Sequence, residues 1–309
     1  MHPITLLAYA TVAAALPLLV LLAVRGPVDG EGDMATGWWG EKTANTNWCE
    51  RDYAVTPYIA EFGNSLSSLA IVGNGIYGIV RHKDSTETRY FWAYFIFIVV
   101  GVGSALFHGT LRREFQLLDE LPMMWGNAIF VYVIKRMRDP FDAPARTGLA
   151  WAIAIATAFA SVIVALFDRE DQTLFLLFYG GGVCWLLYES RKLNNELNSR
   201  GQVLLMETAI LFYIGGFFFW LCDRNFCNDF VAGVPVRSMY LHCLWHLGAG
   251  TGTFFCVLFW IWTRNTIVKR KQAVRGCSPV DRWIQCARMD VEAGGKGGAA
   301  TNELTYHVD

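Results

Sequence analysis

Long apolar stretches alternate with short polar segments along most of the chain. Eight of them are long enough, or nearly so, to cross a bilayer: 4–24, 62–80, 90–110, 121–135, 148–167, 173–189, 203–222 and 239–263. A hydrocarbon core about 30 Å thick requires about 20 mostly apolar residues in a helix. Since the stretches at 121–135 and 173–189 are short, we expect their helices to extend further. The pattern predicts an all-α integral membrane protein.

We divide the chain into four parts. Residues 1–25 form an N-terminal hydrophobic helix, 26–61 a polar lumenal loop, 62–263 a seven-transmembrane helical bundle, and 264–309 a disordered cytosolic tail. The first stretch lacks a basic segment before it and a small-residue cleavage site, unlike an ordinary signal peptide. We therefore expect it to be retained, as a signal anchor or an extra span.

Composition agrees with this division. Of the 309 residues, 54% are hydrophobic and only 17% are charged, which excludes an ordinary soluble domain. The net charge of −1 and the lack of a long basic patch give no indication of a nucleic-acid partner.

The basic residues predict an orientation. The loops after the first, third and fifth core spans, together with the start of the tail, carry 15 Lys and Arg residues, against 8 on the opposite side. Because basic loops stay in the cytosol, the core should begin on the lumenal side. We expect a multi-pass protein of the endoplasmic reticulum or Golgi membrane.

Three histidines lie within or at the ends of apolar stretches. His242 and His246 are four residues apart, so on a helix they share one face. In the predicted orientation His108 ends its span at the same lumenal depth. Three imidazoles with an open fourth position are typical of a catalytic zinc site, where zinc lowers the pKa of a bound water to about 7. The alternative is that these histidines only pack in the bundle, bonded to carbonyl groups or water.

Two further residues lie near this depth. Asp119 is expected to open the third core span, where it either acts as a general base or ligand-orienting carboxylate, or caps the helix. Ser104 precedes His108 by one helical turn and either binds an oxyanion or is a small packing residue.

A polar cluster precedes the core. Three carboxylates, an amide and nearby carbonyl groups lie within fifteen residues and have the oxygen chemistry that calcium prefers. They are Asn47, Trp48, Glu50, Asp52 and Glu61. The alternative is a solvated polar loop.

The cysteines leave two pairings open. Cys49 and Cys227 both fall in predicted lumenal segments, where disulfides form, and Cys222 is a rival partner for Cys49.

At these residues the chain resembles the alkaline ceramidases, seven-span hydrolases related to the progestin and adiponectin receptors. The resemblance covers about residues 45–263. The matching strings are Asn47-Trp-Cys-Glu50, Tyr58-Ile-Ala-Glu61, Gly103-Ser-Ala-Leu-Phe-His108, Gln116-Leu-Leu-Asp119 and His242-Cys-Leu-Trp-His246. The chain departs from the family at Asn47, where Asp is usual, and at Gly63, where Trp is customary.

The resemblance implies hydrolysis of the ceramide amide to a sphingoid base and a free fatty acid. It implies zinc ligands at His108, His242 and His246, and catalytic roles for Ser104 and Asp119. It also implies a calcium site at the polar cluster and a disulfide between Cys49 and Cys227. A zinc-containing receptor without turnover is the alternative from another class, and a transporter with a structural metal ranks last.

Overall fold

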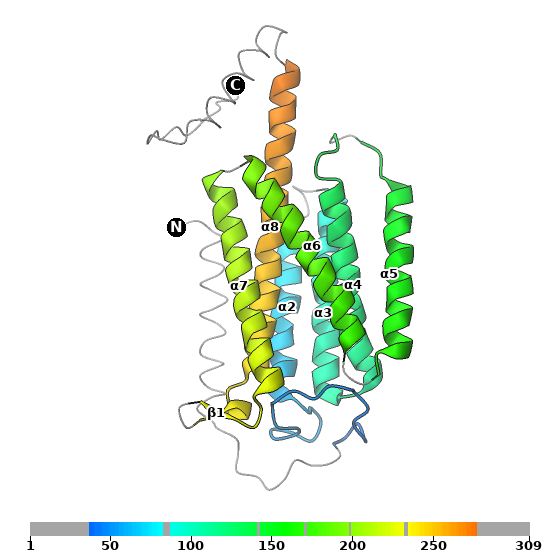
Figure 1. Cartoon of the computed structure of the whole chain (residues 1–309), viewed down its shortest axis with the longest axis vertical. Coiled ribbons are helices and arrows are strands. Elements are labelled where there is room, and N and C mark those ends of the chain that lie inside the picture. Colours follow the sequence, from blue (N-terminus) through cyan, green and yellow to red (C-terminus); the bar gives the residue numbers. More distant parts are fainter. Residues whose placement is uncertain are drawn as a thin grey trace. The chain divides into compact units, whose positions relative to one another are not determined.

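Helices make up nearly all of the regular structure in the computed structural model (Figure 1). The structure describes residues 37–82, 87–140, 143–169, 172–197, 199–231 and 234–276. Within these ranges the elements are α2 (Phe62–His82), α3 (Thr88–Thr110), α4 (Arg113–Lys135), α5 (Thr147–Phe167), α6 (Thr173–Leu197), α7 (Arg200–Asn225), β1 (Phe230–Val231), β2 (Val234–Pro235), a 3₁₀ turn (Val236–Ser238) and α8 (Leu241–Gly276). The expected N-terminal helix and most of the expected tail lie outside the described residues. The contacts below all lie within the compact unit that ends at Arg264.

Each predicted core stretch coincides with one helix, although α8 runs on to Gly276, so residues 264–276 are helical where a disordered tail was expected. Among the helix starts, that of α4 differs most from the prediction. This helix begins at Arg113, eight residues before the stretch expected at 121–135. Asp119 is therefore in the helix interior, and the expectation that it opens or caps the helix is wrong. The charged residues at the start of α4 can be helical because neighbouring segments bind them. One example is the Arg113 guanidinium, whose Nη2 donates to the Asp168 carbonyl over 2.6 Å.

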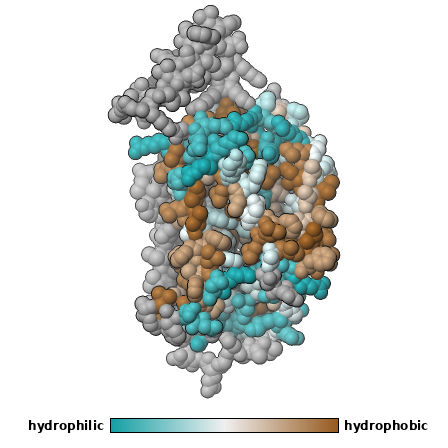
Figure 2. All heavy atoms as spheres, viewed as in Figure 1, coloured by the Kyte–Doolittle hydropathy of each residue, from teal (hydrophilic) through white to brown (hydrophobic). Residues whose placement is uncertain are grey.

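Six of the described helices are long and apolar enough to cross a membrane, namely α3 to α8. On the face shown in Figure 2, hydrophobic residues gather in a band between two hydrophilic ends. Helix α2 is not among the six because polar residues such as Asn64, Ser67 and Ser68 interrupt it. These residues are buried within the bundle.

Helix α3 packs against both α2 and α4. A Cβ on Gly103 would lie only 2.1 Å from the Leu118 carbonyl oxygen, so the backbones of α3 and α4 touch at this point. Pro122 lies four residues beyond Leu118 inside α4 and has no N–H for that carbonyl. Glycine at position 103 thus permits a backbone approach that a side chain there would prevent.

The loop at 37–61 and the β1–β2 hairpin lie at the same end of the bundle (Figure 1). A disulfide joins Cys49 of this loop to Cys227, which follows α7. The pairing expected from the resemblance is confirmed, and Cys222 is a free thiol.

Candidate active site

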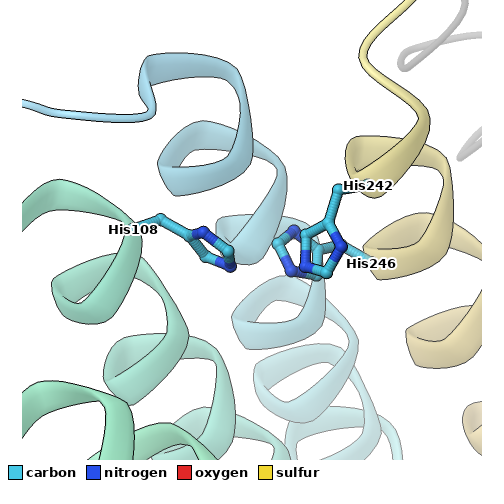
Figure 3. Close-up of side chains that lie close together, drawn as sticks. All are labelled: His108, His242 and His246. Carbon is cyan, nitrogen blue, oxygen red and sulfur yellow. The ribbon is translucent and has the colours of Figure 1, made fainter. Parts of the chain in front are cut away.

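The three histidines meet between two helices (Figure 3). His108 is in the last turn of α3, and His242 and His246 are in the first two turns of α8. Their ring centroids lie 4.6–5.0 Å apart, and all three side chains are buried. Their ligand nitrogens lie within 4.8 Å of one another, so this group could hold a metal ion.

His108 is oriented by a carboxylate. The Glu61 Oε2 lies 2.5 Å from His108 Nδ1, which leaves Nε2 as the nitrogen for a metal. His108 Nε2 and His242 Nδ1 are both buried without a hydrogen-bond partner among the described residues. Because unpaired buried nitrogens are costly, these atoms fit a bound cation such as zinc, whose histidine ligands commonly bond a carboxylate through the other nitrogen.

His246 is held by α2. The Ser67 hydroxyl lies 2.8 Å from His246 Nδ1, and Ser68 lies 3.0 Å from the hydroxyl of Ser104. Neither Ser67 nor Ser68 was among the predicted site residues. Polar residues at 64, 67 and 68 do recur at helical spacing within an otherwise apolar stretch, a pattern that indicates a polar site inside the bundle.

His242 is covered by the loop at 37–61. The Trp48 ring stacks on the His242 imidazole with centroids 3.7 Å apart. Asp223 of α7 accepts hydrogen bonds from the backbone N–H groups of Cys49 and His242 and thereby fastens the loop to the start of α8. The disulfide adds a covalent link at the same place.

Ser104 and Asp119 complete the group. The Ser104 hydroxyl bonds the Asp119 carboxyl and lies 3.4 Å from His246 Nε2. The approach of α3 to α4 at Gly103 lies next to both residues in sequence. A serine hydroxyl and a carboxylate therefore lie beside a buried histidine cluster, an arrangement suited to hydrolysis of a carbonyl compound.

A cavity of about 640 Å³ adjoins this group. Ser104, Asp119, His242 and His246 line it at one end, and its walls are mainly apolar, with side chains such as Phe97, Phe130, Leu186, Met206 and Trp260. Its size falls within the range of pockets that bind small molecules.

The family model described as Ceramidase matches residues 40–280, more than three quarters of the chain and every residue of this site. The chain belongs to the ceramidase family. It is 31% identical to mouse alkaline ceramidase 3 over 249 residues, which cover 77% of the chain and 91% of that relative. It is 29% identical to the yeast alkaline ceramidase YPC1, covering 72% and 77%, and 25% identical to an Arabidopsis alkaline ceramidase, covering 70% and 82%.

In this ceramidase-family chain the residues expected to bind calcium make other contacts. Glu50 accepts hydrogen bonds from the backbone N–H groups of Gly63 and Asn64 at the start of α2. Asp52 pairs with Lys42 and accepts a hydrogen bond from the Asn47 amide. Within the described part of the chain, the three histidines are the one group of three or more His, Cys, Asp or Glu residues gathered closely enough to hold an ion.

Burial acts on the two glutamates that precede α2. Burial, with a smaller contribution from the nearby Glu61 carboxylate, raises the pKa of Glu50 to about 8 in spite of the hydrogen bonds from Gly63 and Asn64, which lower it. Burial likewise raises the pKa of Glu61 to about 8. A cation close to these carboxylates would favour their charged forms.

Proposed function

We propose that this protein is a zinc-dependent ceramidase that hydrolyses the ceramide amide to a sphingoid base and a free fatty acid. The observation that carries the proposal is the convergence of three buried histidines with Ser104 and Asp119 at one end of an apolar cavity. Membership of the ceramidase family supports the substrate class.

His108, His242 and His246 would hold the zinc ion, with Glu61 and Ser67 fixing two of the rings. When bound, zinc would polarise the amide carbonyl and acidify a water molecule. A neutral imidazole donates a lone pair from one nitrogen only, so a partner on Nδ1 determines which atom faces the ion. Glu61 supplies that partner to His108, and Ser67 supplies it to His246.

Asp119 and Ser104 would handle protons and developing charge. Hydrolysis forms a bond between a water oxygen and the amide carbon and breaks the carbon–nitrogen bond. Asp119 would take the proton from the water and return it to the leaving nitrogen, which departs as the free amine. The Ser104 hydroxyl would donate to the carbonyl oxygen as negative charge develops there.

The cavity would hold the hydrocarbon part of the lipid, which we propose enters laterally between α6 and α7. Several residues of these helices line the cavity and are also exposed on the outer surface, including Cys184, Ile214, Phe217 and Leu221. Side chains with both properties are expected where a cavity opens to the surrounding bilayer. Apolar contact along the cavity would stabilise a bound chain by about 0.8 kcal/mol for each buried CH₂ group.

The test is release of fatty acid and sphingoid base from defined ceramides by purified protein, with zinc counted by mass spectrometry. We expect turnover with one zinc per chain, and joint loss of zinc and turnover in His246→Ala. His82→Ala, which removes a half-buried histidine from the last turn of α2, is the matched control and should retain both zinc and turnover. Zinc at one per chain without turnover of any ceramide would contradict hydrolysis and favour a receptor.

We also propose calcium as a second ion, bound by Asn47, Glu50, Asp52, Glu61 and the Trp48 carbonyl. Their oxygen chemistry supports it, and binding would require Asp52 to exchange Lys42 for the ion. Calcium should raise the melting temperature of the wild type but not that of Glu50→Gln. An equal rise in both proteins would contradict this assignment.

We propose that α2 to α8 all span the membrane, with the disulfide end in the lumen of the endoplasmic reticulum or Golgi. The Cys49–Cys227 disulfide supports this orientation because disulfides persist on the oxidising side of a membrane. A cysteine-specific reagent that does not cross membranes should label neither cysteine in intact vesicles, and should label both after opening and reduction. Labelling of reduced Cys227 from the cytosolic side would contradict the orientation.

A further inference from the structure

Two polar side chains that have no part in the mechanism above line the same cavity. Glu120 follows Asp119 on α4, and Gln172 immediately precedes α6. Both are almost fully buried, at 2% and 4% exposure. Gln172 Nε2 donates to Glu120 Oε1 over 2.6 Å, so the two side chains form one polar group in a mainly apolar wall.

The surroundings hold this pair rigidly. Gln116 donates to Glu120 Oε1 over 2.7 Å, and Arg224 of α7 donates to Gln172 Oε1 over 2.9 Å. The Gln172 backbone has φ of +62°, a left-handed conformation that residues other than glycine rarely adopt. Such strained conformations persist only where several neighbouring contacts hold the backbone in place, and they are often found at functional sites.

The pair retains unused hydrogen-bonding capacity. The Gln172 amide nitrogen carries two hydrogens, of which Glu120 takes one, and its carbonyl oxygen can accept a second bond besides that from Arg224. Among the described residues Glu120 Oε2 has no hydrogen-bond partner, and Arg113 Nη1 lies 3.9 Å from it. A group that both donates and accepts would satisfy this pair, and an alcohol hydroxyl has that property.

The position of the Glu120–Gln172 pair indicates which hydroxyl group of the lipid it would bind. In a ceramide, the hydroxyls on carbons 1 and 3 flank the carbon that bears the amide nitrogen, so each lies three bonds from that nitrogen. Glu120 is the chain neighbour of Asp119, the residue that would return a proton to the same nitrogen. We propose that Glu120 and Gln172 form a subsite that binds a sphingoid-base hydroxyl next to the scissile amide. This inference rests on the proposed function, because it takes the amide to react at Asp119.

The test compares ceramide with 1-deoxyceramide and 3-deoxyceramide. The wild type should discriminate against one of the two by about 10- to 100-fold in kcat/KM, as expected when a buried polar group loses its partner. Glu120→Gln should reduce that discrimination to less than about 3-fold by losing activity on ceramide alone. Gln172→Gly should do the same, because glycine tolerates the positive φ while the amide is removed. Glu114→Gln, an exposed change on the same helix, is the matched control and should retain the wild-type ratio.

A binding measurement separates this inference from the proposed function. A ceramide with a fluorophore on its acyl chain is displaced from the protein by ceramide or by each deoxy analogue. Weaker displacement by one deoxy analogue than by ceramide in the wild type, with no such difference in Glu120→Gln, supports the subsite even if no lipid is hydrolysed. Equal displacement by all three lipids, or equal turnover of all three, overturns it. Zinc content and melting temperature in each variant exclude loss of the metal or of folding as the cause.

Discussion

The two ends of the helical bundle both bury charged and polar side chains, but these side chains differ in how many of their nitrogens have a hydrogen-bond partner. At the histidine end, His108 Nε2 and His242 Nδ1 have no hydrogen-bond partner among the described residues. At the other end, every guanidinium nitrogen of Arg264 is bonded. Nε donates to Glu87 over 2.6 Å, Nη1 to the carbonyls of Met137 and Asp139, and Nη2 to the Pro140 carbonyl over 3.4 Å.

This difference in hydrogen bonding indicates that one end of the bundle serves stability and the other serves binding. A saturated arginine ties α8 to the segments before α3 and after α4, and contributes stability. Unsaturated imidazoles are a cost to the folded chain unless something binds them. Substitutions at the histidine end should therefore affect activity, and substitutions at the Arg264 end should affect stability.

The largest expected effect is that of Asp119→Asn. If Asp119 transfers protons as proposed, its removal should lower kcat by about 10²- to 10⁴-fold while zinc content and melting temperature stay the same. Turnover on defined ceramides checks the rate, and mass spectrometry checks the zinc. Loss of zinc in this variant would mean that Asp119 supports the metal rather than the proton transfer.

A smaller loss is expected from Gly103→Ala. The added methyl would meet the Leu118 carbonyl oxygen and move α3 away from α4, which separates Ser104 from Asp119. Misplacement by about 1 Å can cost about 10²-fold in rate. Gly109→Ala is the matched control on the same helix, because a Cβ there is 3.6 Å from its nearest neighbour. Equal activity in both variants would show that the close approach does not set the catalytic geometry.

At the opposite end, Arg264→Met should lower the melting temperature and leave turnover per folded molecule unchanged. Several buried carbonyls and Glu87 lose their donor, which should cost about 2–3 kcal/mol, or about 5–10 °C for a protein of this size. Lys269→Met, an exposed change on the same helix, should have no effect on either quantity. A fall in turnover per folded molecule would show that the two ends are coupled.

The smallest effect concerns pH. Burial raises the pKa of Asp139, but hydrogen bonds from Arg136 and Arg146 outweigh it and hold the pKa below the ordinary value of 3.8. The charged form therefore stabilises the folded state above that pH, and the stability is lost as the pH falls through the lowered pKa. Asp139→Asn should melt about 2–4 °C lower at pH 7, corresponding to about 1 kcal/mol.

The two melting curves should converge below about pH 3.8. Glu196→Gln, which removes an exposed ion pair with Arg138, is the control and should change little at either pH. A constant difference across the pH range would show that the stabilisation does not come from the Asp139 charge.

Much of the helical core was predictable, because apolar stretches in a membrane have few conformations that satisfy the backbone. The spacing of His242 and His246 was equally readable, since it fixes one helix face. The start of α4 was not. Charges at 112–120 resemble a loop until it is known that Gln172 and the Asp168 carbonyl bind Glu120 and Arg113.

Contacts between segments far apart in sequence account for the rest. Glu61 reaches His108 across 47 residues, and Trp48 stacks on His242 from a loop that reads as solvated. Each pairing depends on how the helices pack, which periodicity does not specify. The calcium ligands, read from one short segment, are still a prediction, because their side chains bind protein groups in this structure.

The Cys49–Cys227 disulfide has a consequence for how the protein is made. It joins residues 178 positions apart, and both cysteines leave the ribosome before α8 does. The loop that carries Trp48 can therefore be fastened before α8 has packed into the bundle. A nascent chain that stops short of α8 would have the crosslink but only one of the three histidines. Any ion that the three histidines bind would thus be taken up only after α8 is in place.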